Sequence, residues 1–289
     1  MALVVAVHGI GQQFKADTVI HDEWWPSLRG GLRLAGGDLS DPNKLACAFY
    51  GNLFRQKNTL PAAPGRGPAT LDDDEIALLE VLWEAAADAE PARVPGPAHY
   101  QTSPTMVATP QFVQRALNAL SRSTFCSGIA QNMFVGDLKQ VVRYFRDSDL
   151  RKNAISSVTN LISNETRVVI GHSLGSVVAY EALCRRASQV KSFVSIGSPL
   201  GMPNVIFNRL KPPPDLFGVG VWPPGISQWT NISDVGDLVA NPKRLQPLFG
   251  GDLQDISVHN GSDAHHGERY LTAVECGMAI WRGLNCDGK

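Results

Sequence analysis

Short apolar runs recur along this chain, each bounded by turn-forming residues, and they limit its possible folds more than any other feature. Most positions are apolar in the first four runs, at residues 3–7, 46–50, 168–170 and 193–196, whereas a strand with one face in water alternates apolar and polar residues. Such runs are typical of strands that are buried on both faces of a parallel sheet. We therefore predict strands at residues 3–7, 46–50, 168–170, 193–196, 229–233 and 256–259.

Apolar residues at helical spacing occupy several of the intervals between these strands. They give three predicted helix faces, formed by Ile20, Trp24, Leu28 and Leu32, by Tyr180, Leu183 and Cys184, and by Tyr270, Ala273, Val274, Gly277 and Trp281. The alternation of strands with helices predicts an α/β fold. Its sheet is expected to be mostly parallel and doubly wound.

Residues 52–164 interrupt this alternation, because they contain helix signals and loops but no convincing strand. The acidic run at 72–75 and the proline at Pro110 are both typical of helix starts. The interval is far longer than an ordinary connection between two elements. We interpret it as a helical insertion before the strand at 168–170, within a single domain of residues 1–289.

Two interpretations of this insertion stay open. It forms either a lid over a functional site or an ordinary helical layer on the sheet. As a lid, it would line the site with apolar side chains and would have hinges at Gly128 and Gly136. The apolar side chains considered for this lining are Phe112, Phe125, Met133 and Phe134.

A serine lies in a sharp turn directly after the strand at 168–170. The turn reads GHSLG, with Ser173 at its centre and a glycine two positions away on each side. A strand that turns abruptly into a helix strains the backbone of the turn residue, and larger side chains at the glycine positions would collide. The serine hydroxyl is then exposed at a helix N-terminus, where N–H groups and the helix dipole stabilise an oxyanion. The pattern indicates a nucleophile, and a plain glycine-rich turn is the alternative.

This GHSLG turn, together with VVAVHGIG near the N-terminus, resembles the α/β-hydrolase superfamily. The likeness is to lipase-like and esterase-like members, in particular bacterial hydrolases that begin with VHGIGQQ. It follows the strand order over most of the chain and is weakest over residues 52–164. The resemblance implies an α/β-hydrolase fold with Ser173 as the nucleophile. The other residues of the two motifs are His8, Gly9, Gly171, His172 and Gly175.

The superfamily places an acid and then a histidine after the nucleophile. The segment WTNISDVGDLVANP contains two acids, and the lipase-like pattern of an acid followed by valine and a small residue matches Asp237, with Asp234 as the alternative. The segment DISVHNGSDAHHGERYL contains three histidines. The resemblance places the histidine a few residues before Tyr-Leu, which favours His265 and leaves His266 as the alternative. We discount His259 because it lies in or at the end of a predicted strand.

The resemblance also implies an oxyanion hole made of two backbone N–H groups. One belongs to Ile10, which follows the His-Gly pair of the first motif, and the other to Leu174, which follows the serine. Two further histidines, His8 and His172, flank the site. We expect both to pack beside it and not to carry protons.

Neither a metal nor a cofactor is expected. The segment GIGQQF fails the dinucleotide-binding pattern, because Phe14 stands where the third glycine is needed and no acid follows at the right distance. The histidines near residue 265 do not show the three ligands at defined spacing that catalytic zinc needs.

Composition narrows the class of protein further. The net charge of −1, without a basic stripe, argues against nucleic-acid binding. The five cysteines are odd in number and widely spaced, as in a reducing, cytoplasm-like compartment. We find neither a signal peptide nor a run approaching the ~20 apolar residues of a membrane span, and nothing indicates a membrane surface as partner. We therefore expect a cytoplasmic protein with a small-molecule or lipid-like acyl substrate, and the oligomeric state stays open.

The leading hypothesis is a serine hydrolase that cleaves carboxylic esters. In it, His265 takes the proton of Ser173, and Asp237 orients the histidine and stabilises its charged form. The same three residues would serve an acyltransferase, a thioesterase or a peptidase. A binding module with this fold but without turnover is the alternative from another class, and the presence of residues for all three roles argues against it.

Overall fold

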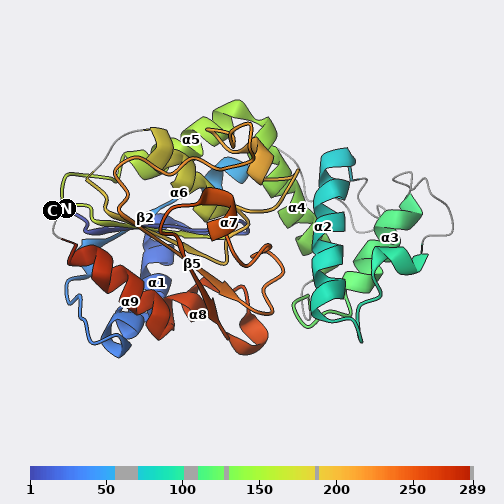
Figure 1. The fold of residues 1–289 in the computed structure, drawn as a ribbon, viewed down its shortest axis with the longest axis horizontal. Helices are drawn as coiled ribbons and strands as arrows, with labels where there is room; N and C mark the ends of the chain where they lie inside the picture. The colour runs from blue at the N-terminus through green and yellow to red at the C-terminus, as the bar shows by residue number, and fades with distance from the viewer. Residues whose placement is uncertain (56–70, 101–109, 127–129, 186–188, 287–289) are drawn as a thin grey trace.

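The computed structural model describes residues 1–55, 71–100, 110–126, 130–185 and 189–286. These residues form a central sheet of six strands with helices on both faces (Figure 1). All pairs of neighbouring strands are parallel, and the strand order is β2-β1-β3-β4-β5-β6. The strands are β1 (Val4–Val7), β2 (Leu45–Ala48), β3 (Val168–His172), β4 (Ser192–Ile196), β5 (Gln228–Asp234) and β6 (Gln254–Val258). The molecule is therefore an α/β protein, as the sequence predicts.

The α-helices connect and cover these strands. They are α1 (Asp17–Leu34), α2 (Asp73–Ala89), α3 (Pro110–Leu120), α4 (Gln131–Arg146), α5 (Ser148–Thr159), α6 (Leu174–Arg185), α7 (Gln246–Phe249), α8 (Gly267–Thr272) and α9 (Val274–Leu284). Short 3₁₀ turns occur at Pro42–Lys44, Gly51–Phe54, Pro97–Tyr100, Phe207–Arg209 and Gly261–Asp263.

All six predicted strands are present, with ends that differ from the predictions by at most two residues. Alternate residues of a strand face different helical layers, which explains the continuous apolar runs. In β1, Val5 and Val7 belong to the core on the side of α5 and α6, whereas Val4 and Ala6 belong to the core on the side of α1 and α9. Burial of each valine- or leucine-sized side chain contributes roughly 1.5–3 kcal/mol to folding.

The order of strands reverses between β1 and β3, which lie side by side in the middle of the sheet. Val7, the last residue of β1, pairs with Gly171 near the end of β3. The chain leaves β1 toward β2 on one side, and it leaves β3 toward β4 on the other. Loops that diverge at such a point leave a crevice outside the carboxyl ends of the strands, where ligands bind in open α/β sheets.

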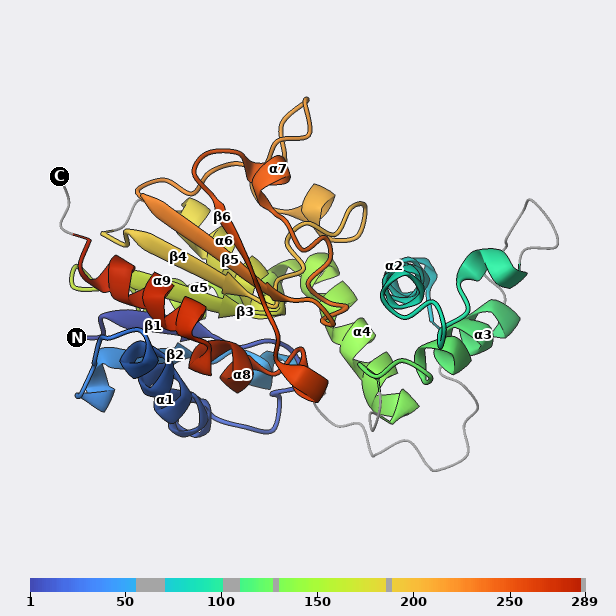
Figure 2. The same cartoon turned by 60° about the horizontal axis from the view of Figure 1, so that its bottom comes forward.

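The insertion divides into two parts. Helix α5 packs beside α6 on the sheet, as an ordinary layer would. Helices α2 and α3 stand apart from that layer, beyond the carboxyl ends of the strands, and α4 leads back from them (Figure 2). Neither of the two interpretations thus holds for the whole insertion, and a mobile lid stays a prediction. Of its two proposed hinges, Gly136 lies inside the continuous helix α4, and Gly128 lies outside the described residues.

The predicted start of α2 is confirmed in detail. Asp72 accepts hydrogen bonds from the backbone N–H groups of Asp74 and Glu75, and the Glu75 side chain accepts one from the N–H of Asp72. This reciprocal capping box satisfies N–H groups that have no partner within the helix. Pro110 is the first residue of α3, also as predicted.

The last predicted helix is wrong as a single element. The structure divides it at Ala273, whose backbone is extended, with φ −61° and ψ 137°. The break redirects the chain so that α9 packs closely on α1. A Cβ atom on Gly277 would lie 2.0 Å from the carbonyl oxygen of Gly31, so the two helices approach each other through glycines. Helical periodicity continues across Ala273 in the sequence, and it therefore conceals the break.

Candidate active site

Ser173 lies in the tight turn between β3 and α6, and its backbone has φ +53°. This left-handed conformation is strained for a residue with a side chain. A Cβ atom on Gly171 would lie 2.5 Å from the Cα atom of Ser176, and one on Gly175 would lie 2.3 Å from the carbonyl oxygen of Val7. The two glycines flanking the serine are thus required by close backbone approach, for the steric reason that the motif predicts.

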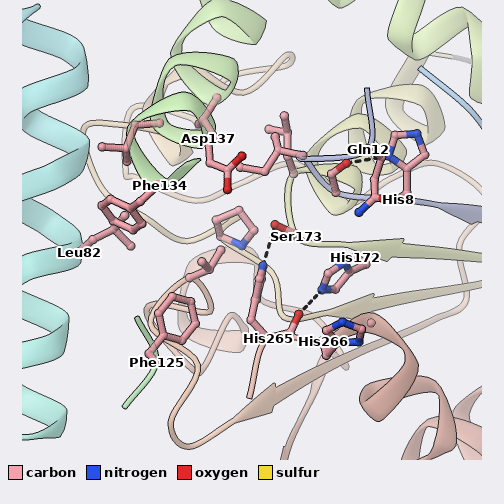
Figure 3. Close-up of a pocket in the computed structure, with 18 of the residues that line it drawn as sticks. His8, Gln12, Leu82, Phe125, Phe134, Asp137, His172, Ser173, His265 and His266 are labelled. Carbon is pink, nitrogen blue, oxygen red and sulfur yellow. Dashed lines mark hydrogen bonds between the residues drawn. The ribbon is translucent and has the colours of Figure 1, made fainter. Parts of the chain in front are cut away.

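His265 connects Ser173 with Asp237. Its Nε2 atom lies 2.9 Å from the Ser173 Oγ atom, and its Nδ1 atom lies 2.8 Å from the Asp237 Oδ2 atom. The three residues follow β3, β5 and β6, so the loops at one edge of the sheet bring them together. Figure 3 shows the contact between His265 and Ser173. With Nδ1–H donating to the carboxylate, Nε2 is free to accept the serine proton.

The Asp237 carboxylate is completely buried and fully hydrogen-bonded. The Tyr270 hydroxyl donates to Oδ2 at 2.8 Å, and the N–H groups of Val239 and Ala240 donate to Oδ1 at 2.9 and 3.3 Å. Burial raises the pKa of Asp237, but the charge and hydrogen bond of His265 and the Tyr270 hydroxyl outweigh burial and lower the pKa below its ordinary value. The carboxylate therefore stays ionised beside the imidazole.

The two alternatives from the sequence lie elsewhere. Asp234 accepts hydrogen bonds from the N–H groups of Gly236 and Asn260 and so holds the turn after β5. His266 is exposed, and its Nδ1 atom lies 2.8 Å from the Glu268 carboxylate. Neither contacts Ser173, so the structure assembles the first-choice residues and not their alternatives.

The two flanking histidines have positions suited to support. The His172 Nε2 atom lies 2.8 Å from the carbonyl oxygen of His265 (Figure 3). Burial lowers the pKa of His172 to about 3, so the ring is neutral and donates to that carbonyl. Burial likewise lowers the pKa of His8 to about 4, and the His8 ring stacks on Tyr50 and donates to the carbonyl of Gly9 at 2.6 Å. The His172 ring thus positions the backbone of His265, and the His8 ring positions the loop after β1.

The loop after β1 carries Ile10, which lines the same cavity as Ser173 and Leu174. A Cβ atom on Gly9 would lie 2.7 Å from the Cβ atom of Ser173, so the loop after β1 passes directly beside it. In the described part of the chain, neither Ile10 N–H nor Leu174 N–H has a hydrogen-bond acceptor. Two unpaired donors at the mouth of the β1–β3 crevice are suited to an oxyanion.

A cavity of about 270 Å³ opens over Ser173. Figure 3 shows the serine between Leu82, Phe125 and Phe134 on one side and polar side chains on the other. The apolar wall comes from the insertion and from loops of the sheet domain, and it includes Leu78, Leu82, Phe125, Phe134, Leu138, Val141, Pro199, Met202, Ile206 and Val239. Two residues considered for this wall are not in it, because Phe112 packs on Trp83 and Met133 is exposed.

The polar side of the cavity contains one ion pair and one contact between a histidine and a carboxylate. Lys15 Nζ lies 2.6 Å from a carboxylate oxygen of Glu23, and His266 pairs with Glu268. A further carboxylate, that of Asp137, enters the cavity from α4. Asp137 is not among the site residues predicted from the sequence, although a signal exists, since it interrupts an apolar stripe of helical spacing. Tyr270 is not among them either, because no local pattern distinguishes its hydroxyl from that of a core tyrosine.

Compared with family models, with curated proteins and with solved structures, the chain matches none of them. Among the described residues, no helix is sufficiently long and apolar to cross a bilayer. The same residues contain no group of three or more His, Cys, Asp or Glu side chains arranged to hold a metal ion.

Proposed function

We propose that this chain is a serine hydrolase of the α/β-hydrolase superfamily that cleaves carboxylic esters through an acyl-enzyme on Ser173. The observation that carries the proposal is the continuous hydrogen-bonded line from Ser173 through His265 to the buried Asp237 carboxylate. An imidazole between a hydroxyl and an ionised carboxylate is the arrangement that activates serine for acyl transfer.

The geometry supports a two-step reaction. His265 removes the hydroxyl proton as Ser173 Oγ attacks the ester carbon, and the resulting oxyanion accepts hydrogen bonds from the N–H groups of Ile10 and Leu174. The imidazolium, stabilised by Asp237, then protonates the leaving alcohol as the carbon–oxygen bond breaks. Water then attacks the acyl carbon as His265 takes a proton from it, the bond between the acyl carbon and Ser173 Oγ breaks, and His265 returns the proton to Oγ as the acid leaves.

Two features support the superfamily. Along the chain, the nucleophile, acid and histidine follow the parallel strands β3, β5 and β6 in that order, and the nucleophile turn has the strained φ of a nucleophile elbow. The apolar wall beside Ser173 favours esters of apolar acyl chains. Acyl transfer, thioester cleavage and peptide cleavage are the other reactions that these residues could carry out. The intact hydrogen-bonded line argues against a pure binding module.

A fluorophosphonate probe tests the proposal directly. We expect stoichiometric labelling of the wild-type protein, located on Ser173 by peptide mass spectrometry, and none of Ser173→Ala. A panel of esters, thioesters and peptides then identifies the reaction, with esters expected to be cleaved fastest. Absence of labelling in a folded wild-type protein, together with no turnover on the panel, would leave the binding module as the better explanation.

A further inference from the structure

Helix α4 presents one face to the cavity. Phe134, Leu138 and Val141 line the cavity at helical spacing, and Asp137 lies on the same face among them. Figure 3 shows the Asp137 side chain extending from α4 toward the region of Ser173. A carboxylate on the apolar, cavity-facing side of a helix is unusual, because that side is normally apolar and the charged side chains face water.

Contacts to the loop after β1 hold this face close to the reaction centre. Gln140, one helical turn beyond Asp137, accepts a hydrogen bond from the N–H of Gly11 at 3.4 Å and donates one to the Gln13 side chain at 3.4 Å. The Asp137 Oδ1 atom lies 3.8 Å from where a Cβ atom on Gly11 would stand. Gly11 directly follows Ile10, so the carboxylate lies beside the proposed oxyanion hole.

Asp137 differs from the other acids of the cavity in its lack of a partner. Glu23 pairs with Lys15, and Glu268 pairs with His266. Within the described residues, Asp137 makes no hydrogen bond and no ion pair. Burial raises the pKa of Asp137 from 3.8 to about 6, and the charge of His265 opposes this rise, so the carboxyl is mainly ionised at neutral pH. A partly buried and unpaired carboxylate in a substrate cavity needs a cation for compensation.

We propose that Asp137 binds a protonated amine of the substrate, a few bonds from the carbonyl carbon that Ser173 attacks. An ammonium group supplies both the donor and the missing charge, and a charge-assisted hydrogen bond is stronger than one from a neutral hydroxyl. The substrate is then an ester that combines an apolar part with an amino group. This inference rests on the proposed hydrolase function, because it takes the bound amine to be part of the substrate. The binding of an ammonium group itself does not depend on turnover.

Binding of n-butylammonium and of 1-butanol, measured by NMR titration or calorimetry, tests the site without any reaction. We expect the wild type to bind the ammonium ion more tightly than the alcohol, and Asp137→Asn to bind the ammonium ion about tenfold more weakly, as for loss of a hydrogen bond to a charged group. The control is Asp149→Asn, which removes the same charge from the exposed first turn of α5 and should change neither affinity. Equal affinities of the wild type and Asp137→Asn for the ammonium ion would overturn the proposal.

Matched esters test the same site during turnover. Ethyl β-alaninate and ethyl butyrate differ only in an ammonium group in place of a methyl group. We expect the ratio of their kcat/KM values to favour the amino ester in the wild type and to fall about tenfold or more in Asp137→Asn. Cleavage of both esters with an unchanged ratio would refute the role of Asp137 alone. Failure to cleave either ester, with ammonium binding intact, would count against the proposed function alone.

Discussion

At the scale of single residues, the site depends on which of two adjacent histidines faces the serine. His265 is partly buried, with 24% of its side chain exposed, and contacts both Ser173 and Asp237, whereas 65% of the His266 side chain is exposed. The neutral His172 holds the backbone of His265 through its carbonyl oxygen. A single imidazole orientation is thus fixed by contacts at three points.

This difference predicts opposite outcomes for two neighbouring alanine variants. His265→Ala should lower kcat by at least about 10⁴-fold, because the serine loses its base. His266→Ala should lower it only slightly, since its ring pairs with Glu268 at the surface. Steady-state kinetics on one ester checks both, with circular dichroism to show that each variant is folded. The reverse ranking would transfer the role to His266.

The second residue-scale prediction concerns stability and Asp137. Because its pKa in the folded protein is raised to about 6, the folded state binds the proton more tightly than the unfolded state, and stability falls as pH rises from about 4 to 6. The full shift corresponds to roughly 3 kcal/mol, and partial exposure reduces this to about 1–2 kcal/mol. Asp137→Asn should therefore stabilise the ligand-free protein above pH 6 and have little effect below pH 4.

Urea unfolding at pH 3.8, 5 and 7.5 measures this difference, given that 3.8 is the ordinary carboxyl pKa. The control is again Asp149→Asn, whose effect should show no such dependence on pH. If Asp137→Asn raised the free energy of unfolding by the same amount at all three pH values, the surroundings would not disfavour the ionised form of the Asp137 carboxyl.

At the scale of elements, close packing of α1 against α9 depends on glycines that the chain carries inside helices. Gly277 contacts the backbone of Gly31, and a Cβ atom there would overlap a carbonyl oxygen. Gly30, the neighbour of Gly31 in α1, has open space around its Cβ position. Glycine inside a helix is otherwise unfavourable by roughly 0.5–1 kcal/mol relative to alanine.

The two positions form a matched pair of substitutions. Gly277→Ala should destabilise the protein by about 1–3 kcal/mol or more, because the overlap forces the helices apart. Gly30→Ala should stabilise it by about 0.5–1 kcal/mol through helix propensity alone. Thermal unfolding of both variants checks the signs. Equal effects would show that α1 and α9 adjust without cost and that the glycines are not needed for packing.

At the scale of the whole molecule, the cavity exists only where the insertion meets the sheet. Ser173 comes from the sheet, while Leu82 and Phe134 come from α2 and α4. Arg146 of α4 bonds both Asp72 and Asp74 at the start of α2, and Arg209 also bonds Asp74. These ion pairs join the two helices to the loop after β4, so that the apolar wall has a defined place beside the serine.

The wall predicts selectivity for acyl length. Each methylene buried against it contributes ~0.8 kcal/mol, so kcat/KM should rise about fourfold per carbon over the first few carbons. Phe134→Ser should weaken this rise, whereas Met133→Ser, on the exposed side of the same helix, should preserve it. A series of straight-chain esters measures both. If kcat/KM of the wild type did not change with chain length, the acyl chain would not lie against this wall.

Local patterns were sufficient for much of this architecture. The six strands, the capped start of α2 and the strained turn at Ser173 follow from the sequence, because apolar spacing, helix caps and glycine placement act between residues a few positions apart. The α/β class follows from their alternation. The break at Ala273 could not be predicted in this way, because it goes together with the packing of α9 on α1, and these helices lie far apart in the sequence.

The selection among candidate site residues required the tertiary structure. The sequence limited the acid to Asp234 or Asp237 and the histidine to His265 or His266, and it favoured Ser173 as a nucleophile over a plain glycine-rich turn. The choice of acid and histidine depends on a contact between residues 28 positions apart, His265 and Asp237, and on one between residues 92 positions apart, His265 and Ser173. Local periodicity carries no information about such contacts. The position of Asp137 in the site also depends on contacts between distant residues. It lies beside Gly11 because α4 packs across the carboxyl ends of the strands, which only the folded chain brings about.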